Sequence, residues 1–365
     1  MTAKLLFARY RPKTLEPRDS LGSKWLRLLD QLDLAPAVAG RRTCIKMHLG
    51  GGTGFTTIHP FFTRKLVEKV KAAGARKVFV TDSPGAVLSA VERGYTAEVI
   101  GCPLVSVTGP ADDQFRRQPI QPAFKTLTAV ELGAAVLDAE ALIDFAHVKG
   151  HGACGFGGAS KNLSMGCVTQ NTRRDLHALE GGIHWTAKLC DSCRTCIENC
   201  PTGAMKFTDA GNMEIFFHHC KLCQHCALIC PQGALKVEGG GYRAFQKGLA
   251  LATAEVLAHF APPRRLFINV LLDISIYCDC WGMTTPSLVP DIGILAGSDI
   301  VAIEQATLDF VKTEDLITST LPPGMAPAGD GHLFQRLYGK DPHAVIEFLE
   351  ELKLGSQEYQ LQEVE

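Results

Sequence analysis

The sequence lacks an excess of charge of either sign. Its 365 residues carry 37 Lys and Arg side chains against 38 Asp and Glu side chains, which gives a formal net charge of −1 at pH 7. A protein that binds nucleic acid usually has a basic excess on at least one domain. The composition therefore argues against a nucleic-acid partner.

Long hydrophobic runs are also missing. A helix that spans a bilayer needs about 20 mostly apolar residues, and the best candidate, residues 266–281, is interrupted by Asp273 and Asp279. The N-terminal segment has no apolar stretch after its basic residues, so it does not have the pattern of a secretory signal. We therefore expect no membrane partner and a cytoplasmic location.

Enough apolar sequence is present for a large core, since 46% of the residues are hydrophobic. Before residue 184, strand-sized apolar runs alternate with helical patterns. Residues 42–48 form one such run, Pro60 opens a helix that Gly74 closes, and residues 77–81 form the next strand. A unit of this size predicts parallel strands joined by a right-handed crossover.

The same alternation resumes after residue 236. We expect helices over 243–260, 300–311 and 341–355, and strands over 265–276 and 291–296. The two halves together predict an α/β fold with an open, mostly parallel or mixed sheet and helices on both faces.

The cysteines are concentrated in the segment that separates the two halves. Eight of the 14 cysteines lie between residues 190 and 230. Residues 190–201 and 220–231 both read C-x2-C-x2-C-x3-C-P, with a period of 30 residues, and the flanking sequences repeat as well. This is an internal duplication. In a cytoplasmic protein, thiols at such short spacings indicate metal ligands rather than disulfides.

The duplicated spacing is typical of ligands for two [4Fe–4S] clusters. Three cysteines of one run can bind three corners of a cubane, and the fourth cysteine of the run binds the other cluster in two-cluster proteins. Zinc is the alternative, but a structural zinc needs only four ligands, which leaves the repetition unexplained. The expected ligands are Cys190, Cys193, Cys196 and Cys230 for one cluster, and Cys220, Cys223, Cys226 and Cys200 for the other.

Over residues 184–237 the chain resembles a bacterial two-cluster ferredoxin domain. We therefore predict three segments. Residues 1–183 form the first part of an α/β domain, residues 184–237 form a small ferredoxin-like α+β insertion with two [4Fe–4S] clusters, and residues 238–365 form the second part with a C-terminal helix.

Two further segments, residues 147–167 and 278–301, begin at the ends of expected strands. Open α/β sheets bind ligands at the carboxyl ends of their strands, so both segments are candidates to line one crevice near a cluster. A small anionic substrate is expected there. The candidate catalytic residues are His147, His151, Lys161 and Asp279, although the histidines could instead bond to backbone and the lysine could cap a helix.

The remaining cysteines allow two interpretations. A further metal site could draw on Cys154, Cys167, Cys280 or His151, but free cysteine often packs as a small, inert hydrophobic residue. We expect only one of Cys278 and Cys280 to face the crevice. A flavin also stays open, because flavin sites can lack a short sequence motif.

Several motifs outside the cysteine segment resemble the domain of unknown function numbered 362. They are Lys46-Met47-His48, Thr81-Asp82-Ser83-Pro84-Gly85, the run from His147 to Asn162, and the run from Pro290 to Leu295. The resemblance covers roughly residues 40–312. It implies an iron–sulfur protein, since members with an inserted ferredoxin module are iron–sulfur proteins of anaerobic and related microbes. It does not imply a substrate.

Two functional interpretations therefore stay open. In the first, the protein is a redox enzyme or its electron-transfer component, in which the two clusters pass single electrons to or from a ligand in the crevice. In the second, it is a non-catalytic electron carrier whose α/β domain docks a partner protein. Both need a redox partner protein, and both are compatible with a homodimer.

Overall fold

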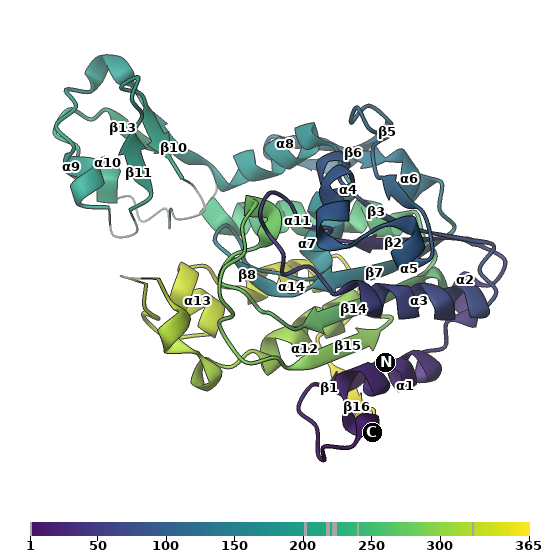
Figure 1. Ribbon diagram of the computed structural model, residues 1–365. Coiled ribbons are helices and arrows are strands. Elements are labelled where there is room, and N and C mark those ends of the chain that lie inside the picture. Colours follow the sequence, from purple (N-terminus) through teal and green to yellow (C-terminus); the bar gives the residue numbers. More distant parts are fainter. Residues whose placement is uncertain (1, 201–202, 217–219, 221–224, 239–240, 323–324) are drawn as a thin grey trace.

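The computed structural model describes residues 2–200, 203–216, 220, 225–238, 241–322 and 325–365 (Figure 1). Its main body is an α/β fold around one sheet of eight strands. In spatial order the strands are β16 (Tyr359–Glu363), β1 (Ala3–Arg9), β15 (Gly293–Gly297), β14 (Arg265–Leu271), β7 (Ala141–His147), β2 (Arg42–Met47), β3 (Lys77–Asp82) and β4 (Leu104–Ser106).

One strand runs against the others. β15 pairs antiparallel with both β1 and β14, whereas the other neighbouring strands of the sheet pair in parallel. The sheet is therefore mixed and mostly parallel, as predicted. Parallel pairing places the carboxyl ends of β2, β3, β7 and β14 at the same edge of the sheet.

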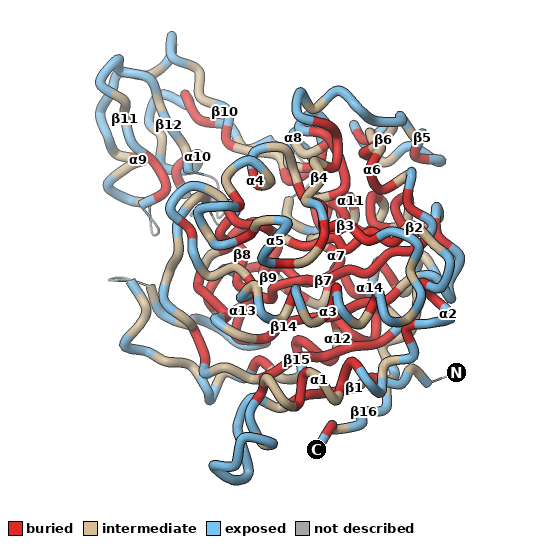
Figure 2. The backbone as a smooth tube through the Cα atoms, turned by 45° about the vertical axis from the view of Figure 1, so that its right-hand side comes forward, coloured by how far each residue is buried: buried red, intermediate tan, exposed pale blue. Residues whose placement is uncertain are grey.

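Helices cover both faces of the sheet. Successive strand residues alternate between the two faces, so Cys44 and Leu142 belong to one core and Ile45 and Ile143 to the other. Figure 2 shows the buried strands enclosed between these layers. The second core contains α1 (Leu21–Gln31), α2 (Ala35–Val38), α3 (Pro60–Ala72), α4 (Pro84–Ser89) and α5 (Ala97–Ile100); the first contains α7 (Ala159–Gly166), α8 (Gln170–Glu180), α11 (Gly241–Ala258), α12 (Ile300–Phe310), α13 (Leu333–Tyr338) and α14 (His343–Glu351).

Local sequence sets several of these boundaries. α3 begins at Pro60, where the fixed φ of proline suits the first helical position. α12 begins after Asp299, whose carboxylate accepts hydrogen bonds from the backbone N–H groups of Val301 and Ala302 at 2.9 and 3.0 Å. Such a cap satisfies donors that the first turn of a helix leaves open.

Some expected boundaries are wrong. β14 ends at Leu271 rather than at residue 276. Asp273 has a φ of 47°, which takes the chain out of the sheet, while Ile274 and Ile276 stay fully buried in the following loop. The apolar run beyond Leu271 therefore reflects burial and not strand pairing. The strands β16 and β1 at one end of the sheet and the hairpin β5 (Phe115–Phe124) with β6 (Leu127–Gly133) were not expected.

The cysteine segment forms a separate small unit that projects from the body (Figure 1). Strand β10 (Gly182–Trp185) pairs antiparallel with β13 (Leu235–Glu238), and β11 (Met205–Phe207) pairs with β12 (Met213–Ile215). Two short helices, α9 (Thr195–Glu198) and α10 (His225–Ile229), lie against each other. The described residues of this unit have their own core, which includes Ile183, Met205 and Leu235. The β10–β13 pairing brings the two ends of the predicted insertion side by side.

The remaining short elements are α6 (Ala134–Leu137), β8 (Lys149–His151), β9 (Gly155–Gly157) and seven three-ten turns. Within the described ranges, no helix is both long and apolar enough to cross a membrane.

Phe145 provides a test of the core. It is fully buried in β7 and stacks on Trp25 with ring centroids 5.8 Å apart. Replacing it by Ala should lower the free energy of unfolding by about 3–5 kcal/mol, because the substitution removes apolar contacts and leaves a cavity. Urea denaturation measures this difference. The control is Leu15→Ala at a fully exposed position, which should change nothing, and a loss below about 1 kcal/mol for Phe145→Ala would contradict the packing.

Candidate functional site

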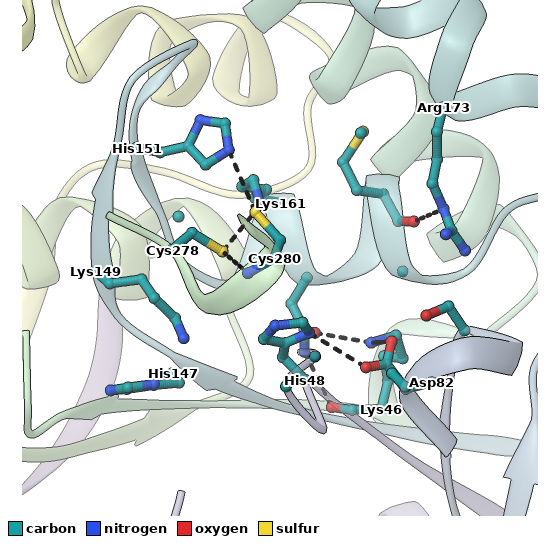
Figure 3. A pocket seen from close by; sticks show the side chains of 18 of the residues that line it. Lys46, His48, Asp82, His147, Lys149, His151, Lys161, Arg173, Cys278 and Cys280 are labelled. Carbon is teal, nitrogen blue, oxygen red and sulfur yellow. Dashed lines mark hydrogen bonds and ion pairs between the residues drawn. The ribbon is translucent and has the colours of Figure 1, made fainter. Parts of the chain in front are cut away.

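A cavity of about 410 Å³ opens where the parallel strands end (Figure 3). Its lining comes from the ends of β2, β3 and β7, from α7 and from the loop that follows β14. This is the edge at which open α/β sheets bind ligands. The cavity brings together three of the four expected catalytic residues, His147, His151 and Lys161.

Lys46 and Asp82 form a buried ion pair beneath the cavity. The Lys46 Nζ atom donates to Asp82 Oδ1 at 3.0 Å, to the Met47 carbonyl at 2.9 Å and to Asn162 Oδ1 at 2.9 Å. Burial favours the protonated carboxyl, but the charge of Lys46 and hydrogen bonds from His48 and Leu49 outweigh it and hold the pKa of Asp82 well below its usual range. Asp82 is therefore a carboxylate.

His48 is oriented by this carboxylate. Its Nδ1 atom lies 3.2 Å from Asp82 Oδ2, and its ring lines the cavity. The opposite ring nitrogen, Nε2, has no hydrogen-bond partner among the described residues. An imidazole held by a carboxylate on one nitrogen, with the other nitrogen buried and without a partner, is an arrangement suited to proton exchange with a ligand.

Lys149 and Asp279 form a second buried ion pair, with Nζ 2.9 Å from Oδ2. Their side chains are 2% and 0% exposed. Burial opposes ionisation of the carboxyl, but Lys149, His147 and a hydrogen bond from Thr56 lower the pKa of Asp279 to about 2. Asp279 does not line the cavity. It lies behind Lys149 and anchors it there.

His147 is held in one tautomer. Its Nε2 atom donates to the Leu272 carbonyl at 2.6 Å, and its Nδ1 atom has no hydrogen-bond partner among the described residues. Burial and the nearby Lys149 charge lower the pKa of His147 to about 3. The imidazole is therefore neutral near pH 7, so it is a weaker candidate for proton transfer than His48.

Lys161 lies between two cysteine sulfurs, as Figure 3 shows. Its Nζ atom is 3.6 Å from Cys278 Sγ and 3.8 Å from Cys280 Sγ. Burial would lower the pKa of Lys161, but the two thiol groups outweigh burial and raise the pKa above its usual value. The chain at this point forms the three-ten turn η5 (Asp279–Trp281) rather than a regular strand. Both sulfurs face the cavity, so the expectation that only one would is wrong. Residues two positions apart lie on the same face even of a regular strand.

His151 faces the second of these sulfurs. Its Nδ1 atom accepts a hydrogen bond from the backbone N–H of Ala153 at 3.2 Å, which places the ring proton on Nε2. That nitrogen is 3.9 Å from Cys280 Sγ. The expected positions of Lys161 and His151 in one cavity thus hold, with the Cys278–Cys280 pair between them.

Four other cysteines lie in the core. Burial raises the pKa of each of their thiols, to about 11 for Cys102 and to about 12 for Cys154 and Cys167, and well above the usual value for Cys44. Such thiols are inert. Across the part of the chain that the structure describes, no three Cys, His, Asp or Glu side chains are placed to hold a single metal ion.

The cysteine segment contains a second, smaller hollow. Cys190, Cys193, Cys196 and Cys230 line it together with Trp185 and other side chains. Cys230 comes from the second run, and the other three come from the first. Equivalent backbone hydrogen bonds repeat the duplication, since Ala204 N donates to Cys200 Sγ and Ala234 N donates to Cys230 Sγ, each at 3.3 Å. Of the second predicted set, Cys200, Cys220 and Cys226 are described and Cys223 lies outside the described residues.

A buried lysine joins the cysteine segment to the cavity loop. The Lys340 Nζ atom donates to the carbonyl of Gly152 at 2.5 Å, to the carbonyl of Cys220 at 3.4 Å and to Glu180 Oε1 at 2.8 Å. Gly152 directly follows His151. The backbone at Cys220 is therefore tied to the loop that presents His151 to the cavity.

Comparison with known proteins gives a family but no activity. The model of the family described as "Domain of unknown function (DUF362)" matches residues 43–309. No curated protein matches the chain. The similar solved structures include a structural-genomics protein from Thermotoga maritima, with 9% identity, a TM-score of 0.38 and coverage of 70% of this chain and 52% of that chain. A second is the lactate racemase apoprotein from Thermoanaerobacterium thermosaccharolyticum, with 12% identity, a TM-score of 0.32 and coverage of 74% and 51%. The chain thus spans about half the length of each.

The Lys149–Asp279 pair gives a stability test with a defined pH dependence. Lys149→Met leaves a buried carboxylate unpaired and should lower the free energy of unfolding by about 3–5 kcal/mol near pH 7. The folded pKa of Asp279, about 2, lies below the value of about 3.9 in an unfolded chain. The contribution of the pair is therefore complete above about pH 4 and is lost as the pH falls toward 2.

Urea denaturation between pH 7 and pH 3 measures the free energy of unfolding of the wild type and of Lys149→Met. The difference between the two values should become smaller toward pH 3. Lys65→Met removes a half-buried partner of Glu68 on the surface of α3 and serves as the matched control, with an expected loss below about 1 kcal/mol. Equal losses for the two variants would show that the buried pair is not formed.

Proposed function

The chain belongs to the DUF362 family, and we propose that it is an iron–sulfur redox protein. In this proposal, residues 184–237 are a ferredoxin-like module with two [4Fe–4S] clusters, and the cavity of the α/β body binds a small anionic ligand. Single electrons pass between the two parts. The proposal depends above all on the convergence of cysteines from both halves of the duplicated segment.

The cysteine geometry supports a cubane better than a single ion. Each cysteine of a [4Fe–4S] cluster binds a different iron, so the four sulfurs need to surround a volume and not to converge on a point. Cys190, Cys193, Cys196 and Cys230 line one hollow, to which both cysteine runs contribute. Cys200, Cys220, Cys223 and Cys226 would hold the second group. When bound, each cluster would accept or donate one electron.

The surrounding backbone supports thiolate ligands. The N–H groups of Ala204 and Ala234 donate to the sulfurs of Cys200 and Cys230, and such hydrogen bonds stabilise negative charge on a ligand and tune its cluster. The turns that aim these N–H groups contain Gly203 and Gly233, with φ values of 61° and 58°. Glycine adopts this left-handed conformation without steric cost.

The charge of the cavity supports an anionic ligand. Lys46 and Lys149 are each neutralised by a carboxylate. Arg173 also lines the cavity, and its guanidinium donates to the carbonyls of Met165 and Val168 at 2.8 and 2.9 Å. Among the described residues it forms no ion pair. Arg173 therefore leaves positive charge facing the cavity, and Lys161 offers a second N–H donor in the same wall. His48 would supply or remove a proton as the charge of the ligand changes.

The alternative, a non-catalytic electron carrier, is supported by the surface of the cysteine segment. Leu189, Phe216, Leu228 and Ile229 are exposed there, and Leu228 is 81% exposed. Apolar side chains on the surface of a small module are typical of a docking site for a redox partner protein. Such a partner is compatible with both functions, so the ligand-binding test below separates them.

The first test is the metal content. Protein prepared without oxygen should contain about eight irons and eight acid-labile sulfides per chain. Cys230→Ala should reduce the iron to about four per chain, because it removes one ligand of the cluster shared with Cys190, Cys193 and Cys196. Cys154→Ala, at a buried cysteine outside the segment, is the control and should keep the full content. About four irons in the wild type, or zinc in place of iron, would refute the proposal.

The second test is anion binding by the cavity. With oxalate and inorganic phosphate as probes, isothermal titration calorimetry should detect binding to the wild type. Arg173→Ala and Lys161→Ala should each weaken it by about 10- to 100-fold, since hydrogen bonds to charged groups contribute about 1.5–3 kcal/mol. Arg11→Ala, at an exposed position away from the cavity, should bind as the wild type does. No binding of either probe to the wild type would favour the carrier function.

A further inference from the structure

Cys278 and Cys280 line the cavity, whereas the other cysteines of the body lie in the core. Cys278 and Cys280 lie two positions apart in one three-ten turn. Cys278 is buried, Cys280 is exposed, and the backbone N–H of Cys280 donates to Cys278 Sγ at 3.4 Å. The loop between them is fixed because the side chain of Asp279 is bonded to Lys149 and Thr56.

One cation, the ammonium group of Lys161, contacts both sulfurs. Lys161 Nζ lies 3.6 Å from one and 3.8 Å from the other, and the Nε2–H of His151 faces Cys280. Positive charge and N–H donors stabilise a thiolate. A hydrogen bond from Cys280 and the charge of Lys161 hold the pKa of Cys278 well below its usual value, whereas the thiolate of Cys278 raises that of Cys280. The pair therefore carries one negative charge and shares one proton.

This arrangement disfavours a metal ion. An ammonium group within 4 Å of both sulfurs would repel a cation bound between them. It favours instead the chemistry of a thiolate beside a thiol. Two residues that are separated by one position in a tight turn have Cα atoms closer than the maximum of about 7 Å for a disulfide.

We propose that Cys278 and Cys280 form a redox-active dithiol that interconverts with an intramolecular disulfide in the wall of the cavity. On oxidation, the Cys278 thiolate and the Cys280 thiol form one S–S bond and release one proton and two electrons. Reduction breaks that bond and takes up the same proton and electrons. The proton is exchanged with solvent at the exposed Cys280.

This step rests on the proposed function, in which the two clusters supply or accept these electrons. Two [4Fe–4S] clusters, each changing by one electron, together match the two-electron change of one dithiol. The pair would thereby collect electrons that arrive singly and present them as a two-electron couple beside the bound anion. The contact of Lys340 with both Cys220 and Gly152 joins the two parts at the His151 loop.

The sequence gives a direct assay. Trypsin cleavage after Arg265 and Lys312 yields one peptide, residues 266–312, in which Cys278 and Cys280 are the only cysteines. The intact protein is equilibrated anaerobically with mixtures of reduced and oxidised dithiothreitol, quenched in acid, alkylated and analysed by mass spectrometry. The peptide should change from doubly alkylated to unalkylated in one two-electron transition, with little singly alkylated form.

Lys161 supplies the second readout. Its charge stabilises the thiolate of the reduced pair, so Lys161→Met should shift the equilibrium about tenfold toward the disulfide, or about 30 mV toward a more reducing potential. Lys161→Arg should keep the wild-type value, and Lys65→Met, on α3 and outside the cavity lining, is the matched control. In Cys278→Ser, the peptide should carry one alkyl group, on Cys280, in every mixture of reduced and oxidised dithiothreitol.

Three results would overturn the inference: a peptide that stays doubly alkylated throughout, a disulfide that joins Cys280 to Cys154, or protection from alkylation that a chelator removes. The assay does not depend on cluster loading. A wild type with about eight irons but no disulfide refutes this inference alone, and a disulfide in a protein without iron refutes the proposed function alone.

Discussion

The parallel pairing of β7 with β2 and of β2 with β3 is the constraint on which the rest of the site depends. Lys46 lies opposite Asp144 on one neighbour and Thr81 on the other, so the chain leaves all three strands at nearly the same level. The residues that follow, His48, Asp82 and His147, therefore meet at one edge without any local sequence relationship between them. A change of one residue in register would turn the side chain of Lys46 to the opposite face of the sheet, away from Asp82.

Two loops that complete the cavity, the one after β2 and the one that contains Cys278 and Cys280, are joined by hydrogen bonds. Thr53 N donates to the Gly282 carbonyl at 2.7 Å, and Thr56 Oγ1 donates to Asp279 Oδ1 at 2.7 Å. Gly52 has a φ of 50°, and a Cβ atom there would lie 2.5 Å from the Gly282 carbonyl oxygen. The glycine-rich run after β2 is thus needed for a close backbone approach to the Cys278–Cys280 loop.

The sequence alone predicted the sheet type, the central strands and the edge at which the site lies. These features follow from short apolar runs, such as residues 42–47, that are buried on both faces. It did not predict the pairing of β1 with β16, because partners more than 350 residues apart leave no local pattern. Lys46, Asp82 and Lys149 were not chosen as site residues, although each stands at the end of an apolar run, where a charged side chain is costly unless it is paired. The expectation that only one of Cys278 and Cys280 faces the crevice was wrong, because residues two positions apart lie on the same face of a strand.

The body and the cysteine segment share a contact but not a core. The apolar residues of the segment form their own cluster, separate from the two clusters that flank the main sheet. What joins them at Cys220 is polar: Lys340, fully buried, donates to one carbonyl on each side, and its charge is balanced by Glu180 of the body. Without the segment, Lys340 would lose its hydrogen bond to the Cys220 carbonyl but would keep its ion pair with Glu180. We therefore expect the body to keep the cavity intact without the segment, while in the complete chain the same lysine fixes the position of Cys220 relative to the His151 loop.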